Sequence, residues 1–277
     1  MILVADSGST KTDWFLCNSH VNKIFTTVGI NPFFVGKEEI INILRNELPV
    51  LPDSVSKVFF YGAGCTPEKS LAVQSALKQH FQTDKINVAS DLLGAARSLC
   101  GDEAGIACIL GTGSNSCIYD GKKITRQIFP LGFILGDEGS GANLGKRLVT
   151  NILRNQLPAA IQQSFFDTFK INVDNILDNI YRKPFPNRYL AQFATFVEHH
   201  TDCQEILKLI ENSFSAFIEQ QILPYKSTKD VAINFVGSIA FTFKNILEPV
   251  LKNYDLKTGK IQKSPLQGLL EYHKVKH

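Results

Sequence analysis

Two short turns rich in glycine and hydroxyl side chains each directly follow a short apolar run. The first spans residues 6–12 after the run 2–5, and the second spans residues 111–115 after the run 106–110. Because glycine permits close approach and unusual φ/ψ angles, such turns let backbone N–H groups and hydroxyls close on a phosphate. Two of them, in separate halves of the chain, predict a duplicated phosphate clamp with a nucleotide between two domains.

The bulk properties favour a globular protein that handles small molecules. The chain has 277 residues, past the length at which one core tends to divide into two. Its net charge of +3 is too weak to indicate nucleic acid as a partner. No apolar run approaches the ~20 residues of a membrane span. Asp6 interrupts the N-terminal apolar run, which has no basic segment before it, so no signal peptide is predicted. We expect a cytoplasmic protein.

The order of predicted elements is the same in both halves. In the first half, three strands precede alternating helices and strands, with strands at 2–5, 13–17, 23–28, 58–61 and 85–89 and helices at 37–48, 67–79 and 91–99. In the second half, strands at 105–110, 114–119 and 123–129 precede helices over 138–224, a last strand at 231–236 and a helix ending before Pro249. One α/β unit used twice, with largely parallel sheets, is the predicted fold.

Asp6 and the glycines of the second turn are the first candidate site residues. Asp6 ends a buried strand, where it could hold Mg²⁺ directly or through water, or could cap a plain turn. The segment Gly111-Thr112-Gly113-Ser114 could likewise be a tight turn between strands. It is no dinucleotide fingerprint, because residue 116 is serine and no helical pattern follows.

Two further aspartates open helical stretches. Asp137 lies in the glycine-rich segment 132–141, where it could cap the following helix or contact a metal or sugar. Asp91 follows a predicted strand, where it could be an N-cap or a general base that receives a substrate hydroxyl proton. Asn31, ahead of a proline, could be merely a turn residue.

These segments together resemble the BadF/BadG/BcrA/BcrD-type ATPase family, and within it the N-acetylglucosamine kinase branch. The resemblance implies the actin-like, ribonuclease-H-like ATPase fold, an α/β fold with two similar domains around a nucleotide cleft. It assigns the ATP phosphates to two loops, made of Gly8, Ser9, Thr10 and Lys11 and of Gly111, Thr112, Gly113 and Ser114. The segment 235–240 is similar to the family's adenosine-binding turn, through Gly237 and Ser238.

The resemblance also implies an amino-sugar site. Asn31, Thr112 and Asp137 match sugar-contacting positions, and Asp91 matches both a sugar contact and the catalytic base. Asp6 and Asp137 match the positions that hold Mg²⁺. Vertebrate N-acetylglucosamine kinases carry Gly-Trp where this chain has Pro130-Leu131, which leaves the acceptor sugar open.

The same resemblance implies a discontinuous first domain, residues 1–103 joined by a C-terminal helix at 264–277, with residues 104–263 as the second. Dimers are common in that family, so a homodimer is one expected state. The predicted function is ATP-dependent phosphorylation of the 6-hydroxyl of an amino sugar such as N-acetylglucosamine, with ATP and Mg²⁺. One alternative is an activator that drives electron transfer into a dehydratase through a cysteine-ligated iron–sulfur cluster. The six cysteines show no C-x-x-C pair. The other alternative is a sugar sensor without turnover.

Overall fold

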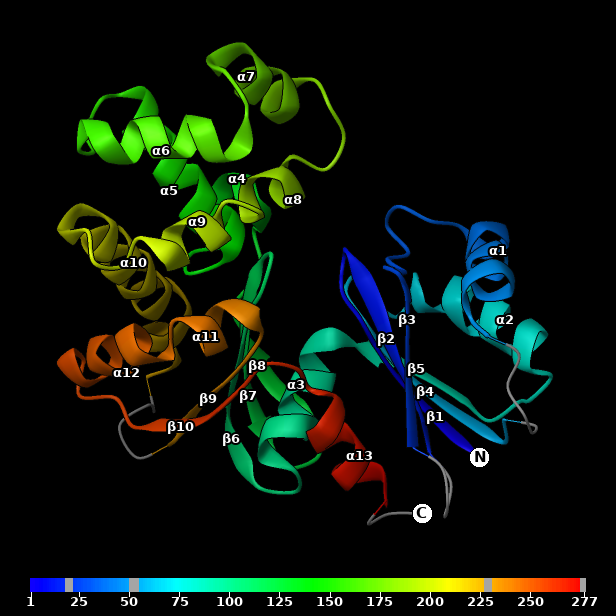
Figure 1. Cartoon of the computed structure of the whole chain (residues 1–277). Helices are drawn as coiled ribbons and strands as arrows, with labels where there is room; N and C mark the ends of the chain where they lie inside the picture. The colour runs from blue at the N-terminus through cyan, green and yellow to red at the C-terminus, as the bar shows by residue number, and fades with distance from the viewer. Residues whose placement is uncertain (18–21, 50–54, 227–230, 275–277) are drawn as a thin grey trace. The chain divides into compact units, whose positions relative to one another are not determined.

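The computed structural model describes residues 1–17, 22–49, 55–226 and 231–274 (Figure 1). The chain forms two compact units: unit 1 holds Met1–Ala104, Tyr119–Ile124 and Ser264–His277, and unit 2 holds Gly105–Ile118 and Thr125–Lys263. The tip of a hairpin, Tyr119–Ile124, thus belongs to unit 1, whereas the expected division placed it in the second domain. The Tyr119 hydroxyl donates to the carbonyl of Gly101 at 3.2 Å, which accounts for the grouping. The last three residues of the expected C-terminal helix, 275–277, lie outside the described residues.

Unit 1 is built on a five-stranded sheet in the order β3-β2-β1-β4-β5. β1 and β2 are antiparallel, as are β2 and β3, whereas β4 and β5 run parallel to β1. Its strands are β1 (Ile2–Ser7), β2 (Lys11–Cys17), β3 (Asn22–Val28), β4 (Lys57–Gly62) and β5 (Ile86–Ser90). Its helices are α1 (Lys37–Glu47), α2 (Ser70–Phe81), α3 (Asp91–Cys100) and α13 (Leu266–Lys274).

Alternating side chains give this sheet two apolar faces. Leu3 and Ala5 of β1 pack with residues of α1 and α2 such as Leu44 and Val73, whereas Val4 packs with α13. This follows from the period of two along a strand, which sends successive side chains to opposite faces. The sheet is therefore covered on both sides (Figure 1). Asp6 lies two residues beyond Val4 on β1, so its side chain points to the α13 face.

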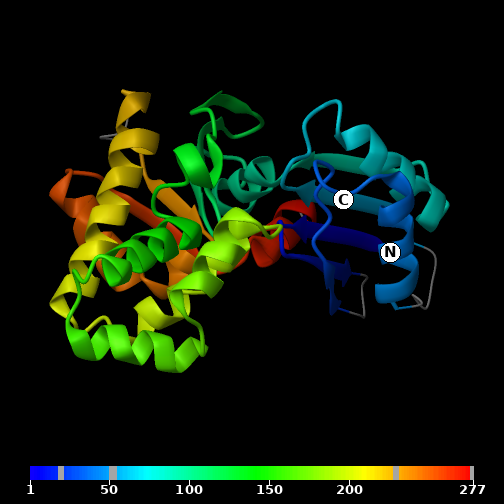
Figure 2. The same cartoon turned by 90° about the horizontal axis from the view of Figure 1, so that it is seen from above.

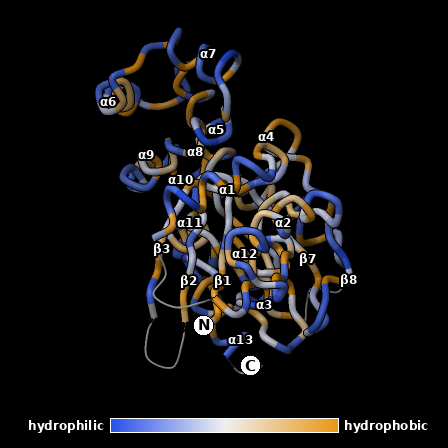
Figure 3. Tube along the Cα trace, turned by 90° about the vertical axis from the view of Figure 1, so that its right-hand side faces the viewer, coloured by the Kyte–Doolittle hydropathy of each residue, from blue (hydrophilic) through white to orange (hydrophobic). Residues whose placement is uncertain are grey.

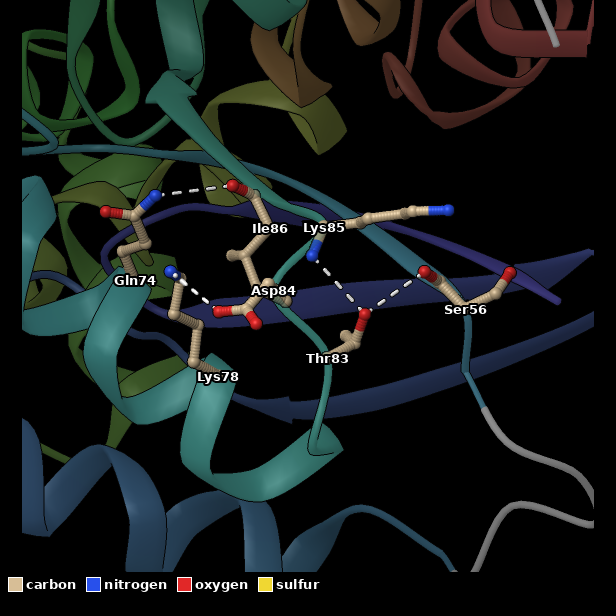
Figure 4. A network of polar contacts seen from close by, with 7 residues as sticks. All are labelled: Ser56, Gln74, Lys78, Thr83, Asp84, Lys85 and Ile86. Atoms are coloured by element: carbon tan, nitrogen blue, oxygen red, sulfur yellow. Dashed lines mark hydrogen bonds and ion pairs between the residues drawn. The ribbon is translucent and has the colours of Figure 1, made fainter.

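A small polar network fixes the connection from α2 into β5 (Figure 4). The Thr83 hydroxyl donates to the Ser56 carbonyl at 3.2 Å and accepts from the Lys85 amide at 3.3 Å. Lys78 forms an ion pair with Asp84 at 3.1 Å. Because the Asp84 side chain is 96% exposed, this pair contributes little. The Thr83 bonds set where β5 begins, and the five residues of β5 then lead directly to Asp91 at the start of α3.

Unit 2 repeats this topology on a second sheet, in the order β10-β9-β6-β7-β8. β9 runs parallel to β6 and to β10, as β4 does to β1 and β5. Its strands are β6 (Ala104–Leu110), β7 (Ser114–Asp120), β8 (Ile124–Gln127), β9 (Ile233–Val236) and β10 (Thr258–Gln262). The duplicated order predicted from the sequence is therefore present.

The helices of unit 2 enclose the larger of the two cores. They are α4 (Gly132–Leu135), α5 (Gly141–Leu153), α6 (Ala159–Phe169), α7 (Val173–Tyr181), α8 (Pro186–Ala191), α9 (Ala194–His199), α10 (Gln204–Phe217), α11 (Ser238–Thr242) and α12 (Lys244–Asn253). A π-helical turn, Ile218–Ile222, and a 3₁₀ turn, Leu223–Tyr225, follow α10. Figure 2 shows the helical segment α6–α9, in green to yellow, which is inserted in the sequence between α5 and α10. Buried aromatic residues such as Phe165, Phe193 and Phe214 fill this core.

Two predicted features of the last third of the chain are wrong. The helix expected to end before Pro249 instead contains it, as α12 continues to Asn253. Leu247, Val250 and Leu251 are buried along α12, and this burial offsets the backbone hydrogen bond that proline cannot donate. β9 was expected to be the last strand, but β10 follows and pairs with it.

No helix among the described residues is long and apolar enough to cross a membrane.

Candidate functional site

The carboxyl end of β1 carries Asp6 between two neighbours on the same row of the sheet. Its register partners are Asp13 on β2 and Tyr61 on β4. The pKa of Asp6 is raised from 3.8 to about 7, chiefly by burial and also by the negative charges of Asp91 and Asp13, while Lys11 opposes these effects. A carboxyl group that is this reluctant to ionise is stabilised as the anion by any cation bound beside it. Asp6 therefore fits one ligand of a Mg²⁺ ion that also takes phosphate oxygens and water.

Asp13 is a site residue that the sequence reasoning missed. It accepts from Lys11 Nζ at 2.6 Å and from the Thr26 hydroxyl at 2.9 Å. Its side chain is only 11% exposed, whereas that of Lys11 is 64% exposed. Asp13 thereby anchors an exposed cationic side chain beside the first glycine turn. A lone acidic residue on an otherwise apolar strand, as in the segment 13–16, was the available signal.

The first glycine turn is closed on itself and rests on Gly29. The Gly8 amide donates to the Lys11 carbonyl at 2.9 Å, and the Gly29 amide donates to the Thr10 carbonyl at 3.1 Å. A Cβ on Gly29 would lie 2.5 Å from the Gly8 carbonyl oxygen and 2.7 Å from the Ser9 carbonyl carbon. Gly29 is thus required for this approach. The structure therefore brings Gly8, Ser9, Thr10 and Lys11 together at the end of β1.

Ile30, the residue before Asn31, is held by a pair of hydroxyls, from Ser7 on β1 and Thr12 on β2, that the sequence reasoning did not single out. The Ser7 and Thr12 hydroxyls lie 2.6 Å apart, and the Ser7 hydroxyl accepts from the Ile30 amide at 3.0 Å. Asn31 Oδ1 accepts from the Phe33 amide at 3.0 Å, as expected for a turn residue. The turn interpretation is thus correct for this oxygen, and the buried side chain also lies against Gly64.

Asp91 is not the N-cap of α3. Ser90 caps that helix by accepting from the Leu93 amide at 3.2 Å, and Asp91 is the first helical residue. Burial raises the pKa of Asp91 from 3.8 to about 6, against the stabilising backbone amide of Leu92, which lies 2.8 Å from Oδ1. A carboxyl group whose pKa lies just below neutral pH is suited to accept a proton in a reaction step.

In unit 2, Asp137 lies against the second glycine turn. Its Oδ1 accepts from the Ser114 amide at 3.1 Å, and a Cβ on Gly113 would lie 3.0 Å from its carboxylate. Asp137 has φ of 56°, and burial raises its pKa. Ser140, which accepts from the Asn143 amide at 3.2 Å, caps α5. The capping interpretation of Asp137 is therefore wrong.

The second turn is tied to the start of α5 by its backbone. The Gly111 carbonyl accepts from the Gly141 amide at 2.8 Å, and the Thr112 carbonyl accepts from the Ala142 amide at 3.1 Å. The Ser114 hydroxyl is buried and has no hydrogen-bond partner among the described residues. An unsatisfied buried hydroxyl costs free energy unless a ligand or water completes it. This supports a ligand at the second turn.

Gly237, between β9 and α11, packs on the start of the same turn. Its φ is 126°, and a Cβ there would overlap the Leu110 carbonyl and lie 3.2 Å from the Gly111 amide nitrogen. Ser238 begins α11. The candidate adenosine turn and the second phosphate turn are therefore neighbours within unit 2.

This close approach yields a first prediction. Gly237→Ala should destabilise unit 2 and displace the Gly111 turn, because both the φ angle and the Leu110 carbonyl exclude a side chain. We expect a loss of about 2–4 kcal/mol in the free energy of unfolding. Gly111→Ala is the matched control, since no atom lies within 4 Å of its Cβ position. Equal thermal midpoints for the two variants by calorimetry would refute the packing argument.

An exposed apolar segment precedes Asp137. Phe129 is 77% exposed and Leu131 is 53% exposed, and the region around α4 is coloured mainly as hydrophobic in Figure 3. Pro130 and Leu131 are the positions at which the sequence analysis expected a departure from the vertebrate enzymes. The departure therefore lies on the surface of unit 2.

A comparison with solved structures decides the family. A candidate N-acetylglucosamine kinase from Porphyromonas gingivalis is 45% identical to this chain, covers 100% of both chains and superposes with a TM-score of 0.97. The chain belongs to this N-acetylglucosamine kinase-like family. The resemblance inferred from the sequence is thereby confirmed. No family model matches the sequence.

More distant comparisons agree on the fold. Glucosamine kinase GspK of Vibrio cholerae is 25% identical over 211 residues, which is 74% of this chain and 69% of that protein. A glucokinase of the ROK family from Streptomyces griseus, crystallised with glucose and AMPPNP, is 14% identical. It superposes with a TM-score of 0.54 over 99% of this chain and 98% of its own. The actin-like ATPase fold predicted for this N-acetylglucosamine kinase-like protein is confirmed.

The candidate residues fall into two groups, one in each unit. Unit 1 holds Asp6, the first turn, Asn31 and Asp91, and unit 2 holds the second turn, Asp137 and Gly237 with Ser238. Within the described part of the chain, no three His, Cys, Asp or Glu residues are arranged to hold a metal ion by themselves.

Proposed function

We propose that the protein is an ATP-dependent kinase that phosphorylates the 6-hydroxyl of an amino sugar, with N-acetylglucosamine or a close relative as acceptor. Membership of the N-acetylglucosamine kinase-like family supports sugar phosphorylation. The observation that carries the chemistry is the Asp91 carboxyl group, which opens a helix beside Asp6 and has a pKa of about 6. No observation among the described residues favours an iron–sulfur activator or a sensor without turnover.

The proposed mechanism gives each group one task. Asp91 accepts the proton of the sugar hydroxyl while the oxygen of that hydroxyl attacks the γ-phosphorus of ATP. The bond between the γ-phosphorus and the bridging oxygen of ADP breaks in the same step. Asn31, Thr112 and Asp137 hold the sugar, so that the hydroxyl is aligned with both Asp91 and the γ-phosphorus.

The nucleotide is bound by backbone rather than by many side chains. The turns Gly8–Thr10 and Gly111–Ser114 bind the phosphates through their hydroxyls and backbone amides, and Lys11 adds a positive charge. The amides of Gly8, Gly111 and Ser114 are not among these donors, because they donate within the protein. The Gly237–Ser238 turn admits the adenosine, since glycine leaves room for close approach. Asp6 and Asp137 are the residues that would hold Mg²⁺, and that ion would supply positive charge to neutralise the phosphates. Backbone donors that are already fixed before the reaction need no reorganisation during it.

A panel of amino sugars tests this proposal. We expect ADP release to depend on N-acetylglucosamine, glucosamine or N-acetylmuramic acid, with the preferred acceptor well above the rest. Nuclear magnetic resonance of the product should show phosphorus coupled to the protons on carbon 6. Phosphate on carbon 1 would overturn the proposed position, and ADP release that ignores every sugar would overturn the kinase itself.

A further inference from the structure

A buried polar chain in unit 1 joins three elements behind the carboxylates. Arg97 Nη1 on α3 donates to the Tyr61 hydroxyl on β4 at 2.8 Å. The same hydroxyl lies 2.9 Å from His273 Nε2 on α13, a residue 212 positions away in the sequence. Both Tyr61 and His273 are almost completely buried. None of these three residues has a task in the proposed mechanism.

Tyr61 contacts the two elements that carry Asp6 and Asp91, namely strand β1 and helix α3. It is the register partner of Asp6 on the adjacent strand. Its ring also packs on α3, because a Cβ on Gly94 would lie 2.8 Å from the Tyr61 Cβ and Cγ atoms. Gly94 is one turn from Asp91 at the start of the same helix. The ring therefore sets how closely the first turn of α3 approaches β1 and β4.

Helix α13 packs against both β4 and α3, the two elements that carry Tyr61 and Arg97. The His273 ring stacks on Phe59 with centroids 3.6 Å apart, and the Arg97 guanidinium lies 5.2 Å from the Tyr272 ring. Gly268 packs so closely on the Ser98 carbonyl that no side chain would fit there. Burial of Leu269 and Leu270 on the sheet anchors the helix. α3 is thus clamped between β4 and α13.

The direction of the hydrogen bonds follows from the donors available. A guanidinium only donates, so the Tyr61 oxygen accepts from Arg97 and its own proton is left for His273. A neutral His273 Nε2 can accept that proton, which completes a chain from Arg97 through Tyr61 to His273. Aromatic rings surround this chain: Phe59 stacks on His273, and the rings of Tyr61 and Tyr272 lie 5.8 Å and 5.2 Å from the Arg97 guanidinium.

We propose that Tyr61, Arg97 and His273 are positioning residues that hold the start of α3, and with it Asp91, in the geometry needed for proton transfer. This rests on the proposed kinase function. The C-terminal helix contributes to turnover through this chain, although it carries no residue of the proposed mechanism. Small displacements of a catalytic group lower the rate of reaction without a matching change in substrate binding.

Tyr61→Phe tests the chain because it keeps the ring on Gly94 and removes only the hydroxyl. We expect kcat to fall about fivefold or more, with KM for ATP within about twofold of the wild-type value. His273→Phe, which keeps the stacking on Phe59, should cause a similar loss. The double variant should lose no more than either single one, because both break one chain. Tyr254→Phe is the matched control, as its hydroxyl donates to Glu219 at 2.7 Å in unit 2. Unchanged kcat in Tyr61→Phe, or additive losses, would overturn the proposal.

Amide hydrogen exchange separates this proposal from the kinase function. Tyr61→Phe should speed the exchange of the α3 amides, while those of α1 remain at the wild-type rate. This readout needs no substrate. Faster α3 exchange in a protein that phosphorylates no sugar would support the positioning chain and contradict the kinase function. Unchanged α3 exchange would overturn the chain whatever the substrate is.

Discussion

Asp91→Asn is expected to lower kcat by about 10²-fold or more and to leave the affinity for ATP nearly unchanged. Asparagine preserves the size of the side chain and the bond from the Leu92 amide to Oδ1, so α3 should fold as before. It cannot accept the hydroxyl proton of the sugar. The measurement is ADP release at saturating sugar, together with calorimetric titration of ATP. Near wild-type turnover would remove Asp91 from the proton-transfer role.

Two controls sharpen this experiment. Asp84→Asn removes a carboxylate whose side chain is 96% exposed in the same unit, and turnover should be unaffected. The pH dependence supplies the second control. Because Asp91 must be ionised to accept a proton and its pKa is about 6, the wild-type rate should fall as the pH drops through that value. The residual activity of Asp91→Asn should lack this acid limb.

The repeated fold could be predicted because its signals are local. Short apolar runs such as 2–5 and 106–110 marked the strands, and the glycine-rich turns that follow them marked where two strands end. The short edge strand β10 was missed because Thr258–Gln262 has no buried residue and includes Gly259. Its place in the sheet comes from pairing with β9, which periodicity does not reveal. The end of the helix at Pro249 was predicted wrongly for a similar reason. Burial of the residues around Pro249 outweighs the tendency of proline to end a helix.

The candidate site was predictable where a motif is contiguous in the sequence. The two glycine turns are of this kind. The residues that hold them in place were not found, because their partners are distant. Gly29 packs against the backbone of Ser9, and Gly237 packs against that of Gly111. The Ser7 hydroxyl accepts from the Ile30 amide. In each pair the two residues are far apart in the sequence. The same holds for Tyr61 and His273. Sequence patterns report which residues are chemically suited to a site, whereas tertiary contacts determine which residues orient them.

Asp6→Asn is expected to stabilise the ligand-free protein at alkaline pH and to weaken its binding of Mg·ATP. The pKa of Asp6 is about 7 in the folded chain, against an ordinary value of 3.8. Between these two values the folded state holds a proton that the unfolded state has lost. The ionised carboxylate therefore destabilises the fold increasingly as the pH rises, and the full cost is reached above pH 7. Each unit of pKa difference corresponds to about 1.4 kcal/mol, so the cost at pH 8 is about 2–4 kcal/mol after allowance for partial exposure.

Asparagine removes this cost, since its amide does not ionise. The thermal midpoint of Asp6→Asn should therefore exceed that of the wild type by more at pH 8 than at pH 5.5, while Asp84→Asn should shift neither. Mg·ATP should raise the midpoint of the wild type much more than that of the variant, because bound cations stabilise the anion in the folded state alone. A charged group that destabilises the free protein but not the ligand-bound protein is expected to be retained for binding rather than for folding. Equal midpoint differences at both pH values, with an equal response to Mg·ATP, would show that Asp6 is a turn residue with no part in the nucleotide site.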